Sequence, residues 1–470
     1  MPEIDPAVQE AIDAAGASGT TAWVLASAAL VLFMTPGLAF FYGGMARSKS
    51  VLNMLMMSFS AIGVVSVLWV LYGYSLAFSG DVGGAGIIGD LELVGLEGMT
   101  TSSITNGLYD YVFVGFQMMF AIITLALISG AVADRMKFGS WILFSVLWVT
   151  LVYFPVAHWV FAFGTPLEEG GTGGAGAASA YTAGTGGWIV SKLGALDFAG
   201  GTAVHINAGA AALALVLVLG KRKGFGRDAM RPHNLPLVLV GTGILWFGWF
   251  GFNAGSALGA NGLAGLAFVN TQVATAAAAL AWIGTERLRD GHATTLGVAS
   301  GAVAGLVAIT PACGSVTPLG ALLIGLVAGG ACCLAVTLKH RLGYDDALDV
   351  VGVHLVGGLV GTLMIGLVAS EASTGSSDLQ GLLYGGGPGL LGKQALAAAA
   401  VMAYSFVLTL GIALVVKAVL GLRVSEEEEV TGIDQSTHAE TGYELGGGLS
   451  GSGTGAPGLS PALSSSKVAL

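Results

Sequence analysis

The stretches ALDFAGGTAVHIN (residues 195–207) and ALDVVGVHL (residues 347–355) each open on Ala-Leu-Asp and each carry one histidine. His205 lies eight residues after Asp197, and His354 lies eight residues after Asp346. With a helical rise of 1.5 Å per residue, each histidine lies roughly 12 Å inside its segment. Two such segments entering a hydrocarbon core about 30 Å thick from opposite faces would bring both histidines to its middle. We therefore predict that His205 and His354 meet at the centre of a bilayer.

The rest of the chain has a composition suited to lipid. Of its 470 residues, 54% are hydrophobic and 10% are charged, and the mean hydropathy is +0.80. A soluble domain is about 25% charged, so this composition argues against a soluble enzyme and against a disordered chain. The net charge is −10 and the sequence contains no basic patch suited to nucleic acid. Cys313, Cys332 and Cys333 lack metal-ligand spacing, so we expect no disulfide framework, metal or other cofactor.

Apolar runs of about 20 residues, the length of a membrane-spanning helix, alternate with short polar breaks from Ala22 onward. We predict an all-α polytopic membrane protein with eleven transmembrane helices. They are placed at 22–44, 52–78, 109–133, 140–163, 199–220, 235–257, 262–284, 293–312, 317–338, 347–369 and 395–420. The predicted domains are a short extracellular segment (1–21), the membrane domain (22–422), a cytoplasmic tail (423–445) and a Gly/Ser-rich disordered end (446–470).

Basic residues set the predicted orientation of these helices. Thirteen lysines and arginines follow the odd-numbered spans up to the ninth, whereas the alternate loops hold only Lys192 and Lys393. The N-terminus is therefore predicted outside and the C-terminus in the cytoplasm. The first 21 residues are acidic and contain no basic residue, so we expect no secretory signal.

The two histidine segments also predict an internal repeat. Five spans separate them, an odd number, so the two halves must be inverted relative to each other. A weaker echo relates LAFFYGG (38–44) to FGFNAGS (250–256). We predict two inverted five-helix repeats plus a terminal helix, with the substrate path at the repeat interface near the midplane.

Ionisable residues inside membrane spans tend to mark ion or substrate pathways. The alternative for His205 and His354 is two unrelated core histidines bonded to backbone carbonyls. Asp197 is expected to cap the start of its helix and to shape a cation site, and Asp349 is expected to act similarly, mainly as a structural residue. For His158 we expect a structural hydrogen bond.

Two aromatic clusters, FQMMF (116–120) and WFGF (249–252), stand out among the apolar runs. Such residues usually pack or lie at the interface. The alternative is a gate: two stacked phenyl rings facing a histidine pair would stop a hydrated ion and pass a small neutral molecule. Aromatic rings at the mouth of such a path would hold a cation over their faces.

Four motifs in order resemble the ammonium transporter family (Amt/Mep, with the Rhesus proteins as distant relatives), and specifically its Amt branch. They are DFAGGTAVHIN (197–207), GWFGFNAGS (248–256), TPACG (310–314) and DVVGVH (349–354), and the resemblance runs from about residue 36 to residue 443. It implies a homotrimer with one pore per subunit and uptake of ammonium, as NH₄⁺ or NH₃, across the plasma membrane. By this resemblance the twin pore histidines are His205 and His354, and the gate phenylalanines are Phe120 and Phe252.

The resemblance also assigns an outer site that recruits ammonium. Ser256 matches the serine of the outer mouth, Phe116 belongs to the same site, and Asp197 is the structural aspartate beside it. The family has a tryptophan at the outer mouth, but this chain has Phe161 there and Trp159 two residues earlier. A phenyl ring offers a weaker face and no indole N–H.

The resemblance further implies that a PII-type signal protein docks on the cytoplasmic face. Gly432, Asp434, His438, Glu440 and Tyr443 match the family's ordered, regulatory tail. The acidic run 426–429 is either a solvated stretch or a latch onto the basic loops at 221–231 and 339–341.

Three other functions remain as alternatives. The histidine pair would suit an intramembrane metalloenzyme, although HExxH is absent from the sequence. The same fold would also suit an ammonium sensor that signals through its tail, or a gas channel of Rhesus type.

Overall fold

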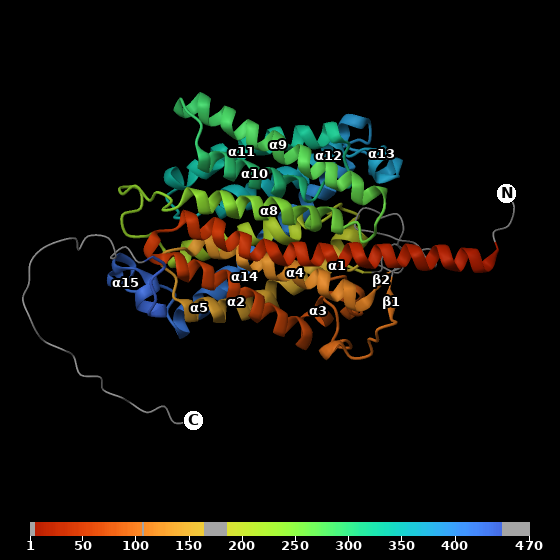
Figure 1. Cartoon of the computed structure of the whole chain (residues 1–470), viewed down its shortest axis with the longest axis horizontal. Helices are drawn as coiled ribbons and strands as arrows, with labels where there is room; N and C mark the ends of the chain where they lie inside the picture. Colours follow the sequence, from red (N-terminus) through yellow and green to blue (C-terminus); the bar gives the residue numbers. More distant parts are fainter. Residues whose placement is uncertain (1–4, 106–107, 164–185, 444–470) are drawn as a thin grey trace, which may run out of the picture.

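Long apolar helices, packed side by side, make up the chain in the computed structural model of Figure 1, which describes residues 5–105, 108–163 and 186–443. The helices are α1 (Pro6–Met45), α2 (Val51–Leu68), α3 (Tyr74–Phe78), α4 (Asp110–Ser129), α5 (Phe138–Trp148), α6 (Phe154–Phe161), α7 (Asn207–Leu219), α8 (Leu235–Gly255), α9 (Gly262–Asp290), α10 (Thr295–Ile309), α11 (Pro318–Leu342), α12 (Val356–Val368), α13 (Glu371–Thr374), α14 (Gly389–Val419) and α15 (Glu426–Thr431). A small antiparallel pair is formed by β1 (Ile104–Thr105) and β2 (Leu108–Tyr109).

Short π-helical segments start or continue several of these helices. They are η2 (Trp69–Gly73), η6 (Val149–Tyr153), η8 (Trp188–Leu193), η9 (Gly201–Ile206), η10 (Val351–Leu355) and η13 (Asp434–His438). Such segments are rare and often occur at functional sites. Both predicted pore histidines lie in one: His205 in η9, which leads into α7, and His354 in η10, which leads into α12.

Ten helical stretches of the described chain are long and apolar enough to cross a membrane. The protein is thus a multi-pass membrane protein, as predicted. The eleventh predicted span, 293–312, corresponds to α10, an apolar helix that is shorter than the others. The predicted edges agree with the helices within a few residues at most places, but α9 continues to Asp290, six residues beyond its predicted end.

The first helix departs most from its predicted bounds. α1 begins at Pro6, so much of the predicted extracellular segment is helical, and Figure 1 shows this part extending past the other helices. Residues 6–18 are rich in alanine and contain glutamine and glutamate, which favour helix over loop. The predicted disordered end, 446–470, lies outside the described residues.

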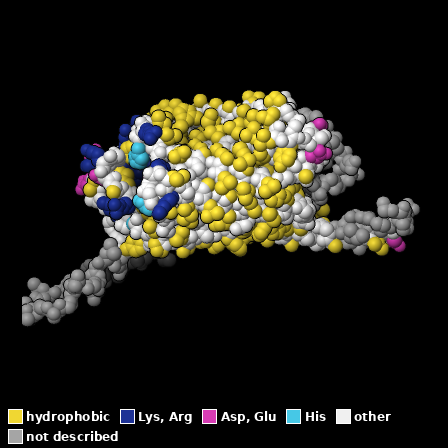
Figure 2. Space-filling model, turned by 90° about the horizontal axis from the view of Figure 1, so that it is seen from above, with side chains coloured by type: hydrophobic (Ala, Val, Ile, Leu, Met, Phe, Trp, Pro, Cys, Tyr) yellow, Lys and Arg dark blue, Asp and Glu magenta, His cyan; other side chains and the backbone are white. Residues whose placement is uncertain are grey.

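Side chains divide the surface into an apolar middle and charged ends. Figure 2 shows hydrophobic side chains over the middle and lysines and arginines gathered at one end. That end, called the basic end below, holds the loop after α7 (residues 220–234) and the tail (residues 420–443). Large hydrophobic side chains on the outer helices are exposed, for example Leu280, Leu319 and Val407, which suits contact with lipid.

Small residues let α9 and α11 approach closely. A Cβ atom on Gly325 would lie 2.2 Å from the carbonyl oxygen of Ala274, and one on Gly329 would lie 2.2 Å from that of Ala278. Small residues at this four-residue spacing are typical of packed membrane helices, because lipid offers no hydrophobic driving force and close packing takes its place.

We expect Gly329→Ala to lower the free energy of unfolding by about 1–3 kcal/mol, because the new methyl group forces two backbones apart. Gly330→Ala is the matched control, since its Cβ would meet only Thr285 Oγ1 at 3.7 Å. Thermal unfolding of both purified variants in one detergent measures the difference. Equal melting temperatures would contradict the close approach of the two helices.

Candidate functional site

The two predicted pore histidines lie against each other in the interior. Their Nδ1 atoms are 3.3 Å apart, and their rings are nearly parallel, with centroids 5.3 Å apart and 23° between the planes. Both side chains are buried. The imidazoles thus hydrogen-bond to each other through these nitrogens, one as donor and one as acceptor. The Nε2 atom of His205 is buried and has no hydrogen-bond partner in the described structure.

Asp197 holds the start of the helix that carries His205. Its carboxylate accepts hydrogen bonds from the backbone N–H groups of Gly200 at 2.8 Å, Gly201 at 2.6 Å and Thr202 at 2.7 Å, and from the Thr202 hydroxyl. Gly200 has a φ of +108°, in the region that favours glycine. The carboxylate therefore satisfies donors that a helix start leaves unpaired.

Asp346 does the same for the helix that carries His354. Its carboxylate accepts from the N–H groups of Val350 at 3.1 Å and Val351 at 2.7 Å. Burial raises the pKa of this carboxyl to about 6, against the opposing charge of Lys339. Asp349, expected to mirror Asp197, instead forms an ion pair with Lys339 at 2.5 Å. The second cap is therefore Asp346, the aspartate eight residues before the histidine. Asp349, the aspartate of the Ala-Leu-Asp match, is not the cap.

A stack of aromatic rings leads to the histidine pair. The ring centroids of Phe120 and Phe252 are 4.4 Å apart, and Phe252 lies 6.1 Å from His205, nearly parallel to it. Trp249 stacks on His205 at 5.4 Å and donates its indole N–H to Thr310 Oγ1 at 2.8 Å. Both phenyl rings are buried, and they form a row of ring contacts that ends at the histidine pair.

A small cavity of about 10 Å³ lies beside the rings of Phe116 and Phe161, both of which contact Phe120. Its lining is Phe116, Gln117, Phe161, Phe163, Phe198, Ser256 and Leu258. A volume of this size holds about one water-sized molecule. Three of the predicted recruitment residues, Phe116, Phe161 and Ser256, thus come together. The Ser256 hydroxyl donates to Phe252 O at 2.8 Å, which leaves its oxygen to accept.

Gln117 is a polar lining residue to which the sequence analysis assigned no role. Its side chain is buried, and its Oε1 atom has no hydrogen-bond partner within the described residues. An unpaired amide oxygen is a ready acceptor for an N–H donor in the cavity. In the sequence, the only indication of a role for Gln117 is that it is a polar residue inside the aromatic cluster 116–120.

Trp159, the other predicted recruitment residue, is directed elsewhere. Its indole N–H donates to Ile87 O at 2.8 Å, and its ring packs against Trp188 and Tyr404. It does not line the described cavity. The neighbouring His158 makes the structural hydrogen bond that we expected, from Nδ1 to Ala77 O at 3.0 Å.

Comparison with known proteins identifies the family of the chain. The family profile described as Ammonium Transporter Family matches residues 22–443. The chain belongs to the ammonium transporter family. It is 58% identical to the ammonium transporter of Mycobacterium tuberculosis over 447 residues, 91% of this chain and 90% of that one. The family members are transporters, so the chain is a transporter and not an enzyme.

Two solved structures share the fold. Candida albicans Mep2 is 34% identical, with a TM-score of 0.76 over 87% of each chain. A structure titled "Sensor Amt Protein" is 29% identical, with a TM-score of 0.78 over 90% of this chain and 98% of that chain.

The tail of this transporter folds back onto the basic end. Glu429 is fully buried; its carboxylate accepts from the backbone N–H of Lys223 at 2.6 Å and pairs with Arg423 at 2.5 Å. The preceding Glu426 and Glu427 are exposed. The acidic run 426–429 is thus partly solvated and partly bonded to the loop after α7, through Lys223.

The rest of the tail docks on the start of α2. The carboxylate of Asp434 accepts from the N–H groups of Leu52 at 3.0 Å and Asn53 at 2.8 Å. Burial raises the pKa of Asp434, and these two hydrogen bonds oppose the shift. Further along, the Tyr443 hydroxyl lies 2.8 Å from His233 Nε2. Two unpaired N–H groups at a helix start are therefore satisfied by the tail.

We expect Asp197→Ala to lower the free energy of unfolding by about 1–3 kcal/mol, because it leaves buried N–H groups unpaired. Asp197→Asn is the matched variant, since its amide oxygen still accepts one or two of these bonds and should recover part of the loss. Thermal unfolding of the purified proteins compares them. An alanine variant as stable as the wild type would rule out the capping role.

Proposed function

We propose that this member of the ammonium transporter family carries ammonium through a hydrophobic pore in each subunit. The observation that carries the proposal is the continuous order of groups: an outer cavity, the rings of Phe120 and Phe252, and then His205 and His354. Each neighbouring pair of rings along this line has centroids within about 6 Å.

The chemistry of each group supports a step in this path. Phe116, Phe161 and Ser256 receive the ammonium ion at the outer cavity, through ring faces and a hydroxyl oxygen. A bare cation is costly in the dry space beyond, so near Phe120 the ion gives its proton to the unpaired Nε2 atom of His205 and becomes NH₃. The neutral molecule then passes His205 and His354, and the hydrogen bond between their Nδ1 atoms provides a relay for the proton.

The two histidine helices support the predicted inverted repeat. α7 ends at the loop beginning at residue 220, and α12 follows Asp345, which is bound to Arg222 of that loop. The helices therefore run in opposite directions, and each begins with an aspartate cap and a π-helical segment. We place the protein in the plasma membrane as a homotrimer that takes up nitrogen. The N-terminus is outside, and the basic end and the tail are in the cytoplasm.

We also propose that a PII-type signal protein binds the cytoplasmic face and blocks the pores. The docked tail supports this, because it forms a structured surface at that face. A metalloenzyme gains no support: the described residues contain no cluster of three or more possible His, Cys, Asp or Glu ligands. The sensor function has one point in its favour, the similarity to the structure titled "Sensor Amt Protein".

We expect His205→Ala and His354→Ala each to change ammonium transport strongly while the protein folds normally. The reason is that each removes one half of the relay, in a site otherwise lined by apolar groups. His292→Ala, at an exposed position, is the control. Currents recorded on purified protein in supported membranes during an ammonium jump separate charge movement from neutral conduction. Wild-type currents and uptake in both pore variants would refute the pore assignment.

We expect Phe161→Trp to lower the half-saturating ammonium concentration about two- to fivefold, because indole binds cations more strongly than phenyl. Trp159→Phe serves as the control outside the cavity and should leave that concentration unchanged. Initial uptake rates measured against ammonium concentration provide the comparison. If only the Trp159 variant changes, ammonium is recruited on the other side of α6.

We expect a chain truncated after Leu422 to reach the membrane but transport more slowly, because the start of α2 and the loop after α7 lose their tail contacts. Truncation after Gly446 keeps every described contact and should have no effect. Uptake is normalised to the protein in the membrane. Full activity of the shorter chain would contradict a role of the tail in transport.

We expect a PII-type protein from the same cell to co-purify with the full-length transporter. If no PII-type protein is retained, the proposed partner is wrong. This result leaves the pore assignment untouched.

A further inference from the structure

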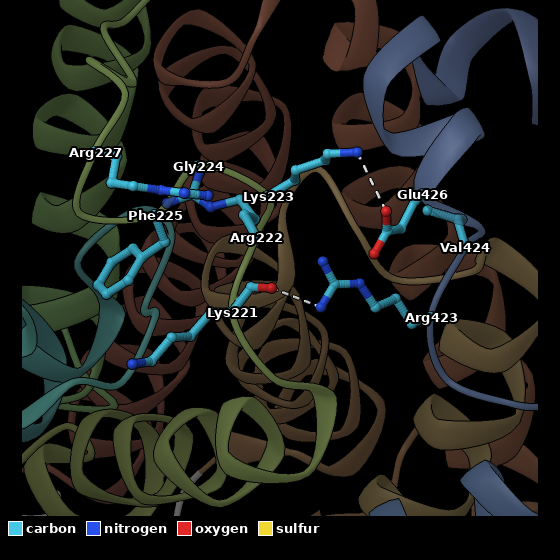
Figure 3. A pocket seen from close by; sticks show the side chains of 9 residues that line it. All are labelled: Lys221, Arg222, Lys223, Gly224, Phe225, Arg227, Arg423, Val424 and Glu426. Atoms are coloured by element: carbon cyan, nitrogen blue, oxygen red, sulfur yellow. Dashed lines mark hydrogen bonds and ion pairs between the residues drawn. The ribbon is translucent and has the colours of Figure 1, made fainter.

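A second, larger cavity lies at the basic end, away from the proposed pore. It has a volume of about 570 Å³ and lies between the loop after α7 and the start of the tail. In Figure 3 the loop residues Lys221–Arg227 form one wall, and Arg423, Val424 and Glu426 form the other. The volume is within the range of small-molecule sites, about 300–1,000 Å³.

The cavity has more positive than negative charge. Glu426 is the only acidic residue in its lining, and it pairs with Lys223 at 3.2 Å. Both partners of this pair are exposed, so the pair is weak and easily exchanged. Lys221 and Arg227 also line the cavity, and neither has an ion-pair partner among the described residues. The Lys221 ammonium lies over the face of the Phe225 ring, 5.8 Å from its centroid.

The two remaining arginines of the lining are already engaged. Arg222 is buried and binds both oxygens of Asp345, at 2.8 Å for its closest pair. Arg423 pairs with Glu429 and donates to the carbonyl oxygen of Lys221 at 2.6 Å. The contact from Arg423 to Lys221 joins the two walls of the cavity. Lys221 and Arg227 are the uncompensated charges, and the guanidinium of Arg423 has five N–H donors, so it keeps N–H groups for a ligand beside its two contacts.

We propose that this cavity binds a phosphate-bearing anion of the cytoplasm, held by Lys221 and Arg227 of the loop and by Arg423 of the tail. Arginine and lysine are the side chains that bind phosphate oxygens most strongly, through charge-assisted hydrogen bonds. A dianion would also displace Glu426 from its ion pair with Lys223. Because the ligand contacts both walls, its binding favours the docked position of the tail.

The loop wall of the cavity is also bonded to the start of the helix that carries His354. Arg222 follows Lys221 directly, and its guanidinium holds Asp345, whose neighbour Asp346 caps the start of η10. Burial alone would raise the pKa of Asp345, but hydrogen bonds from Arg222 and its charge hold that pKa below its usual value. Arg222, a lining residue of the cavity, is thus bonded to the neighbour of the aspartate that caps the helix of His354.

The test measures binding of pyrophosphate and of inorganic phosphate to the full-length protein in nanodiscs of phosphatidylcholine, by titration calorimetry. We expect saturable binding of pyrophosphate to the wild type. The variant Lys221→Gln/Arg227→Gln should weaken it at least about tenfold, since each lost charged hydrogen bond is worth this much. The variant Arg231→Gln/Arg341→Gln removes the same charge from exposed positions outside the lining and should bind like the wild type.

Two further arms identify the source of the phosphate and the role of the tail. If the ligand is a lipid headgroup, phosphatidylglycerol will be retained by the wild type in native mass spectrometry and lost only in the cavity variant, while pyrophosphate fails to bind. Truncation after Leu422 removes Arg423 and should weaken binding several-fold; unchanged affinity would overturn the bridging of loop and tail. Equal behaviour of the cavity and control variants toward both ligands would overturn the site. Melting temperatures of all variants verify that they are folded.

Discussion

The pairing of backbone N–H groups by two buried carboxylates is the constraint on which the centre of this protein depends. In a membrane every backbone donor needs a partner within the protein, because lipid supplies none. The helices that carry His205 and His354 begin with donors that have no intrahelical acceptor. Asp197 and Asp346 supply the acceptors. Without them, these helices would start elsewhere and carry their histidines to another depth.

Once both helix starts are capped, the histidines face each other in an apolar environment. Aromatic rings cover the pair on the side of the outer cavity: Trp249 and Phe252 lie almost parallel to His205. Each histidine then has the other as its main polar partner. A pair of this kind costs stability, since the Nε2 atom of His205 has no partner in the described structure. The substrate path that we propose would give this nitrogen a partner, because ammonium carries N–H bonds.

Much of the fold could be predicted from the sequence because periodic apolar runs and the membrane thickness determine where helices start and end. The contact between the two histidines could be predicted from their spacing alone. The choice of Asp349 as the second cap was wrong for a local reason: a sequence match ignores where the helix begins, and the first paired N–H groups belong to Val350 and Val351. The direction of Trp159 depends on packing against Trp188 and Tyr404, which lie far from it in the sequence.

The π-helical starts of the two histidine helices show why the site needs tertiary structure. Sequence periodicity assumes 3.6 residues per turn, and a π-helical segment rotates the following side chains relative to that pattern. His205 and His354 both lie inside such segments. Their directions are therefore set by the caps below them and by the rings beside them, and not by the regular helix that continues after them. Asp346, which caps the helix of His354, lies near the basic end. Asp197, which caps the helix of His205, lies near the outer cavity. A change at the basic end thus has a short bonded route, through Arg222 and Asp345, to the helix start that carries His354.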